Sequence, residues 1–247
     1  LSGDPTSAQS SAAGDVASVV PVFAIMDRLG MLASRRDTSD GPVRVQLVGA
    51  KANAGHSHED KGSIILEAFG EELLLDRGTC FYGDARSELL KFSWRHNLLT
   101  PNDSDGRPLH QVNPLPSAVI PRGEGDERRL HATIDVSAAW PDSLSHCART
   151  VRSGDPRRLL VVDTVTRTER ASVSVHFHSR FPWEKRGDRW TSRGRRGAVT
   201  IEPRWRPMRA EAVEDLFDSA YQPVYRLSLH TTDAIHFELE TEISVST

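Results

Sequence analysis

Residues 64–76 read Ile-Ile-Leu-Glu-Ala-Phe-Gly-Glu-Glu-Leu-Leu-Leu-Asp, and this stretch carries the clearest structural signal in the chain. Two apolar runs, 64–69 and 72–76, flank the dipeptide Gly70-Glu71. A tight turn that contains glycine between two short apolar runs is typical of a β-hairpin. We therefore predict two antiparallel strands here, with Asp76 at the end of the second strand.

The same texture extends outward from this hairpin. From Val43 onward, short β-branched or alternating runs are separated by Gly, Pro, Asn and Asp, which is typical of a sandwich or barrel. Residues 100–129 are rich in Pro, Gly, Asn and Asp and are expected to form a long irregular connection. The predicted strands are 43–48, 63–69, 72–75, 130–136, 145–151, 158–166, 172–178, 198–202, 224–230 and 234–245.

The first 42 residues differ from the rest of the chain. Residues 1–14 are rich in Ser, Ala, Gly and Asp, and we interpret them as a linker or tail. Between residues 16 and 34, apolar side chains recur at spacings near three and four, which predicts one amphipathic helix. We therefore divide the chain into a segment 1–42, made of a linker and a helix, and a β domain 43–247.

Composition excludes several classes of protein. With 38% hydrophobic and 26% charged residues, the 247-residue chain is an ordinary globular protein, and an all-β fold of this length fits one domain. A net charge of −3 and scattered arginines argue against a nucleic-acid partner. No stretch approaches the ~20 apolar residues that span a bilayer. Two cysteines are too few for a disulfide scaffold. Because the chain begins with Leu1, we expect the native start to lie upstream.

A histidine motif precedes the hairpin: residues 55–63 read Gly-His-Ser-His-Glu-Asp-Lys-Gly-Ser. His56 and His58 would project to one side of an extended backbone, and His combined with carboxylates suits zinc. Spacing alone, however, favours surface or core histidines. In an extended strand His58 would also lie about 23 Å from Asp76, at ~3.3 Å per residue. The segment 55–62 must therefore fold back for the two to meet, which its flanking glycines permit.

The order of these motifs resembles the heparinase II/III-like family, which includes heparinases, heparan sulfate lyases and oligoalginate lyases. The resemblance rests on Gly-His-x-His-x-Asp-x-Gly-Ser at 55–63, two apolar strands around Gly70, Asp-Arg-Gly at 76–78, Tyr82 and His-Asn at 96–97. The segments 149–151, 159–163 and 175–178 also resemble strands of that family. The likeness covers roughly residues 43–247.

The resemblance implies a fold and a site. In this family a helical toroid precedes an antiparallel β-sandwich (a super-sandwich), and substrate lies in the cleft between them. Carried over by position, His58, Asp76 and His96 resemble the zinc ligands, and His56 resembles the histidine that faces the substrate. Tyr82 is a second candidate for substrate contact, although strand packing is the favoured alternative. We expect the zinc to be structural, because ligands from three separate segments would tie them together.

Other polar residues keep two interpretations each. Asp60 either orients a ligating imidazole or stabilises the turn. His176 and His178 share one strand face, and core packing is favoured over a second metal site. Arg77 is interpreted as a solvated surface residue rather than a contact for a sugar carboxylate. Glu59 would be the general base if the chain were instead a zinc hydrolase.

The reaction implied by the resemblance is β-elimination at a uronic acid. In the family, groups of the helical domain carry much of this chemistry, so we expect weak or absent turnover from this chain alone. The expected partners are an acidic polysaccharide or oligosaccharide and a missing or separate helical toroid domain. The expected location is the periplasm or the exterior of the cell. The alternative is a non-catalytic carbohydrate-binding or interaction module that a metal stabilises.

Overall fold

The computed structural model describes residues 21–81 and 83–247. Nearly all regular structure in it is strand, with three short helical turns, α1 (Ser87–Leu90), η1 (Ser93–Arg95) and η2 (Ser137–Ala139). The strands are β1 (Phe23–Met26), β2 (Met31–Thr38), β3 (Gly41–Val48), β4 (Ile64–Ala68), β5 (Glu71–Leu74), β6 (Leu99–Pro101), β7 (Arg122–Gly125), β8 (Leu130–Asp135), β9 (Leu144–Asp155), β10 (Arg158–Ala171), β11 (Val173–Ser179), β12 (Trp183–Arg186), β13 (Arg189–Arg193), β14 (Ala198–Pro203), β15 (Arg209–Phe217), β16 (Pro223–His230) and β17 (Ala234–Ser246).

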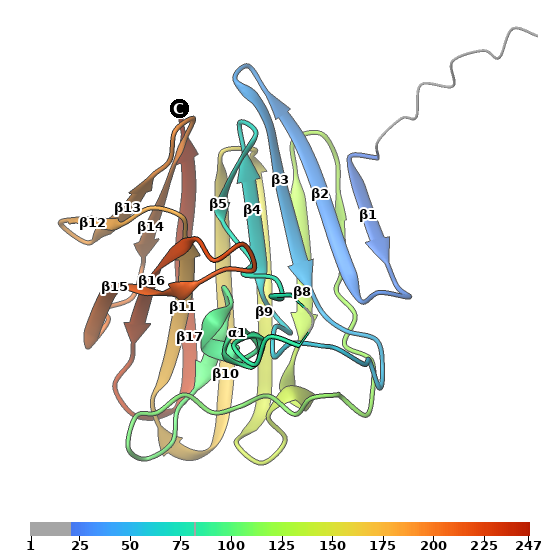
Figure 1. Cartoon of the computed structure of the whole chain (residues 1–247), viewed down its shortest axis with the longest axis vertical. Helices are drawn as coiled ribbons and strands as arrows, with labels where there is room; N and C mark the ends of the chain where they lie inside the picture. The colour runs from blue at the N-terminus through green and yellow to red at the C-terminus, as the bar shows by residue number, and fades with distance from the viewer. Residues whose placement is uncertain (1–20, 82) are drawn as a thin grey trace, which may run out of the picture.

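Three antiparallel sheets form two facing layers (Figure 1). One layer is an eight-stranded sheet in the order β12-β13-β14-β17-β10-β9-β8-β7. The other layer combines a five-stranded sheet, β1-β2-β3-β4-β5, with a four-stranded sheet, β15-β16-β11-β6. A backbone hydrogen bond from Leu75 N to His178 O, 3.1 Å long, joins these two smaller sheets. The prediction of an all-β antiparallel sandwich is confirmed.

Period-two burial explains why the layers pack. In β4 the inward residues are Ile64, Leu66 and Ala68, and all three are fully buried. In β10, Leu159 and Val161 face inward in the same way. Alternation of this kind gives each sheet one apolar face, and two such faces enclose a shared core. No helix among the described residues is long and apolar enough to cross a lipid bilayer.

The hairpin predicted from residues 64–76 is present. Ala68 pairs with Glu71, so the turn consists of Phe69 and Gly70, one residue earlier than the predicted Gly70-Glu71. Both turn residues have positive φ, 57° and 75°, as a two-residue hairpin turn with the twist of its strands requires. The strands that flank it place Leu75 and Asp76 at the end of β5, next to the connection that leads to α1.

The helix predicted for residues 16–34 is wrong in its described part, which forms β1, a turn and β2. Gly30, at φ 71°, closes the turn, and β2 pairs along its whole length with β3. The inward residues of β2 are Leu32, Ser34 and Arg36. Because two of these three are polar, the sequence hides the period-two pattern, and the pairing with β3 overrides the helical spacing.

Candidate metal centre

Three side chains from separate segments converge at one end of β5. His58 lies in the connection between β3 and β4, Asp76 lies just after β5, and His96 follows η1. One possible ligand atom of each lies within 4.8 Å of the other two, and the two imidazole centroids are 5.4 Å apart. The connection that carries His58 therefore folds back toward the hairpin end, as predicted.

Hydrogen bonds already orient this group. Asp76 Oδ2 lies 2.9 Å from His96 Nδ1, and Asp76 Oδ1 accepts a 2.8 Å hydrogen bond from the backbone N–H of Gly78. His58 Nε2 lies 2.8 Å from the hydroxyl oxygen of Thr79. Thr79 carried no signal in the sequence, because it belongs to no part of the histidine motif. The segment 76–79 thus contacts both imidazoles.

Burial and charge set the protonation of the group. Burial lowers the pKa of His58, and the neighbouring His96 adds to this effect. Burial alone would lower the pKa of His96, but the charge and hydrogen bond of Asp76 raise it. Burial alone would raise the pKa of Asp76, yet His96 holds it well below its ordinary value. At neutral pH Asp76 is therefore ionised and His58 neutral, the forms that bind a cation, whereas the raised pKa of His96 favours a proton that a bound cation must displace.

One further atom indicates that a cation fits here. His96 is fully buried, and its Nε2 has no hydrogen-bond partner among the described residues, although buried polar atoms nearly always have one. A donor set of two imidazoles and one carboxylate suits zinc better than it suits magnesium or calcium. His58, Asp76 and His96 are thus the residues that would hold a zinc ion or a similar divalent ion.

The connection that carries His58 is held by Lys61 and Glu59. Lys61 is fully buried, and its ammonium group donates hydrogen bonds to His58 O and to Asn113 Oδ1. Glu59 Oε2 accepts hydrogen bonds from the backbone N–H groups of Ser93 and Gln111, at 3.0 and 3.2 Å. Because this carboxylate is engaged by two backbone N–H groups and by His110 Nδ1, its position argues against the general-base role that the hydrolase interpretation requires.

Asn97 and Arg149 connect the site to both layers. The side chain of Asn97 donates to Leu75 O at 2.9 Å and accepts from the backbone N–H of His178 at 2.7 Å. Arg149, from β9 in the opposite layer, donates to Gly62 O and to Asn97 O, each at 2.8 Å. Its guanidinium also forms a buried two-point ion pair with Asp163. Both ligand-bearing connections are therefore attached to the core.

Comparison with known proteins places this architecture in a family. The family model for the C-terminal domain of heparinase II/III-like proteins matches residues 40–244. The chain belongs to this family. No curated protein matches it.

Solved structures agree with this heparinase II/III-like assignment. The chain is similar to a mutant of the heparan sulfate lyase HepC from Pedobacter heparinus, with 16% identity and a TM-score of 0.72. It is also similar to the heparinase III gene product BT4657, with 14% identity and a TM-score of 0.71. The matches cover 91% and 92% of this chain but 36% of each of those chains. The chain thus spans about a third of their length, and at this identity the likeness establishes the fold.

Within this heparinase II/III-like domain, His56 differs from His58. His56 is exposed and has φ 53°, so the backbone is not extended there and only His58 turns into the buried cluster. His56 lies beside Thr79 and Lys91 at a surface hollow of about 410 Å³. An exposed imidazole next to the candidate metal centre is able to contact a ligand. Tyr82, the other predicted substrate contact, lies outside the described residues.

The other polar candidates have clear positions. Asp60 forms a 3.6 Å ion pair with Lys61, and among the described residues no hydrogen bond joins it to an imidazole. This favours the loop-stabilising interpretation. His176 and His178 are fully buried, as expected for packing residues. The interpretation of Arg77 as a solvated residue is wrong, because its side chain is fully buried and paired with Asp215. Sequence reasoning failed there because Asp215 lies 138 residues away.

Proposed function

We propose that this chain is the β-sandwich portion of a polysaccharide lyase that cleaves uronic-acid-containing acidic glycans by β-elimination. Family membership and the similarity to a heparan sulfate lyase support the lyase class. The observation that carries the proposal is the cluster of His58, Asp76 and His96 with the exposed His56 beside it. In this arrangement an exposed imidazole lies next to a buried candidate metal centre.

The proposed chemistry defines what His56 can do. In β-elimination at a uronic acid, the C5 proton is removed, the glycosidic oxygen at C4 leaves, and negative charge builds on the C6 carboxyl group. An imidazole can accept or donate a proton at its ring nitrogens, so His56 is suited to exchange a proton with the sugar or to donate a hydrogen bond to its carboxylate. Tyr82 is the second proposed contact with the substrate.

The metal is proposed to be zinc in a structural role. A zinc ion bound by His58, Asp76 and His96 would hold three connections of the fold together and place positive charge near the substrate. The hydroxyl group of Thr79 and the backbone N–H of Gly78 already orient two of the proposed ligands, through contacts to His58 and Asp76 respectively. His56 is separate from this group, which leaves it available to the glycan.

We propose that a helical toroid domain in a longer protein supplies the remaining catalytic groups. The heparan sulfate lyase and heparinase structures are almost three times as long as the matched region, which supports this division of labour. This chain alone is therefore expected to show weak or absent turnover on heparan, alginate and hyaluronan. Because such glycans lie outside the cytoplasm, we place the whole protein in the periplasm or outside the cell.

The test is the substitution His56→Ala in the longer protein that contains this chain. We expect kcat to fall about 10²- to 10⁴-fold, the usual contribution of a general acid or base, with zinc content unchanged. Turnover is followed by the absorbance of the unsaturated uronate. The matched control is His131→Ala, because His131 is an exposed histidine on β8 with no part in the cluster.

Two outcomes would contradict the proposal in different ways. Unchanged turnover in the His56→Ala protein would remove the assigned role of His56. Binding of acidic oligosaccharides by the unmodified longer protein without any unsaturated product would instead favour the non-catalytic carbohydrate-binding module.

A further inference from the structure

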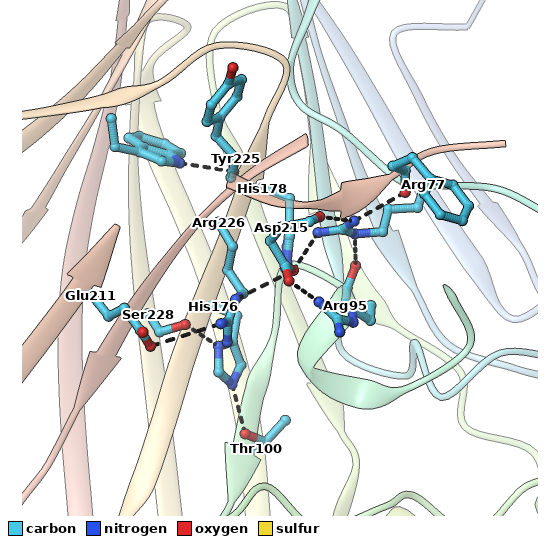
Figure 2. A network of polar contacts seen from close by, with 12 residues as sticks. Arg77, Arg95, Thr100, His176, His178, Glu211, Asp215, Tyr225, Arg226 and Ser228 are labelled. Carbon is cyan, nitrogen blue, oxygen red and sulfur yellow. Dashed lines mark hydrogen bonds and ion pairs between the residues drawn. The ribbon is translucent and has the colours of Figure 1, made fainter. Parts of the chain in front are cut away.

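A buried carboxylate on β15 connects the two ligand-bearing segments that follow β5 and η1. Asp215 is the buried residue of an otherwise exposed or half-buried edge strand. Figure 2 shows Arg77, Arg95 and Arg226 pointing toward it from different directions. We call Arg77, Arg95 and Asp215 the Asp215 cluster. Two of its members stand next in the chain to proposed metal ligands, since Arg77 follows Asp76 and Arg95 precedes His96.

The contacts within the Asp215 cluster are close and specific. Arg77 Nη2 lies 2.7 Å from Asp215 Oδ2, and Arg77 Nη1 donates to the carbonyl oxygens of Asp215 and Phe217. Arg95 Nη1 donates to the other carboxylate oxygen, Asp215 Oδ1. Arg77 Nε also donates to Arg95 O at 3.2 Å, which ties the two ligand-bearing segments directly to each other. One carboxylate thus holds both backbones at a set separation.

The backbone of β15 is distorted where it presents this carboxylate. The pairing of β15 with β16 shifts between Glu214 and Phe217, which is a β-bulge, and Leu216 has φ 53°. A residue other than glycine in the left-handed backbone region costs about 1–2 kcal/mol of conformational energy. Bulges commonly redirect a side chain near a functional site. Here the bulge turns Asp215 inward, toward the two arginines. The strain is therefore coupled to the position of this one side chain.

The charges favour an ionised Asp215. Burial alone would raise the pKa of this carboxyl group, but the hydrogen bond from Arg95 and the charges of Arg95, Arg77 and Arg226 lower it. Arg226 Nε lies 3.4 Å from Asp215 Oδ2, and its Nη2 lies 3.8 Å from Glu211. Asp215 is therefore ionised, and its Oδ2 faces Arg77 while its Oδ1 faces Arg95. A charged acceptor makes these hydrogen bonds stronger than neutral ones.

We propose that Asp215 is a positioning residue for the metal centre, holding Arg77 and Arg95 so that the adjacent Asp76 and His96 keep ligand geometry. This inference rests on the proposed zinc site and adds a residue 139 positions from Asp76 to it. Metal ligands must meet their ion within a few tenths of an ångström, so a support that sets the spacing of two of them changes affinity. His58 lies on another connection and is not held by this cluster.

The test compares zinc affinity in the full chain before and after Asp215→Asn. Supporting groups behind metal ligands contribute about 10- to 100-fold to affinity, so we expect the zinc dissociation constant to rise by that factor. The visible spectrum of bound Co²⁺, which depends on ligand geometry, should change as well. The control is Glu71→Gln, because Glu71 accepts three backbone hydrogen bonds from Arg195, Arg196 and Gly197, none of which adjoins a ligand.

A second variant keeps the inference testable if the Asp215→Asn protein does not fold. Arg95→Met removes one of the two arginines that contact Asp215 in the cluster, and the Arg95 side chain is partly exposed. We expect the zinc dissociation constant to rise in this variant too, by a smaller factor. Zinc affinity within about threefold of the unmodified chain in both variants overturns the inference, as does an equal loss in Glu71→Gln. An unmodified chain that takes up no zinc would refute the metal centre itself, a result distinct from unchanged affinity after Asp215→Asn.

Discussion

The Asp76→Asn protein is expected to lose stoichiometric zinc and the part of its stability that zinc provides. The unmodified chain should gain about 2.7 kcal/mol at free zinc one hundred times the dissociation constant. For a domain of this size that gain raises Tm by about 5–10 °C, at ~2–4 °C per kcal/mol. Asn keeps the size of Asp76 and can still accept from Gly78 N, but it removes the negative charge that faces His96. Elemental analysis and thermal unfolding with and without a chelator measure both effects.

The matched control for Asp76→Asn is Asp142→Asn. Asp142 is an exposed carboxylate in the turn between η2 and β9, so this variant should keep its zinc and its response to chelator. His58→Ala and His96→Ala should both behave like Asp76→Asn, because one cation needs all three donors. Absence of metal from the unmodified protein, or a zinc-dependent Tm that survives in the Asp76→Asn protein, would argue against the centre.

The second large effect is expected for Arg149→Met. Arg149 and Asp163 are both about 98% buried, and their two-point ion pair has lengths of 2.7 and 2.8 Å. Removing one partner of a buried pair usually costs about 3–5 kcal/mol, because the other charge stays buried alone. The carbonyl oxygens of Gly62 and Asn97 also lose their shared donor. Denaturant unfolding should show this loss, with a fall in Tm of about 6–20 °C.

Two further variants test the cause of the stability loss in Arg149→Met. Arg189→Met breaks an exposed pair with Glu202 and should change stability far less, because water screens such pairs. The double variant Arg149→Met with Asp163→Leu should recover part of the stability, since well-packed apolar side chains often replace a buried ion pair at little cost. A double variant as unstable as Arg149→Met would assign the loss to the two carbonyl groups instead of the buried charge.

Much of the β architecture could be predicted because its signals are local. The hairpin of β4 and β5 needs only two apolar runs and a turn, all within 13 residues. Two of the strands that went unrecognised, β2 and β15, carry no such signal. β15 is exposed or half-buried except at Asp215, and β2 turns Ser34 and Arg36 inward, so neither shows apolar alternation. Their pairing partners, β16 and β3, decided their structure.

The candidate site likewise contains residues that the sequence indicated and residues that only the folded structure identifies. The motif order indicated His58, Asp76 and His96 through a family resemblance, and the structure brings the three together. Nothing in the sequence indicated that His56 would be exposed while His58 is buried, because this depends on the left-handed backbone at His56. Thr79 was missed for a similar reason, since its contact with His58 exists only once the connection folds back.

By itself, the sequence determined the strand-rich class and the central hairpin, and its resemblance to the heparinase II/III-like family indicated the residues of the candidate metal centre. Only the tertiary structure decided that Arg77 and Arg149 are buried and that Asp215 contacts Arg77 from 138 residues away. The physical reason is that backbone preference and apolar period act over a few neighbouring residues. The environment of a charged side chain is set instead by whichever distant groups the packed layers place around it.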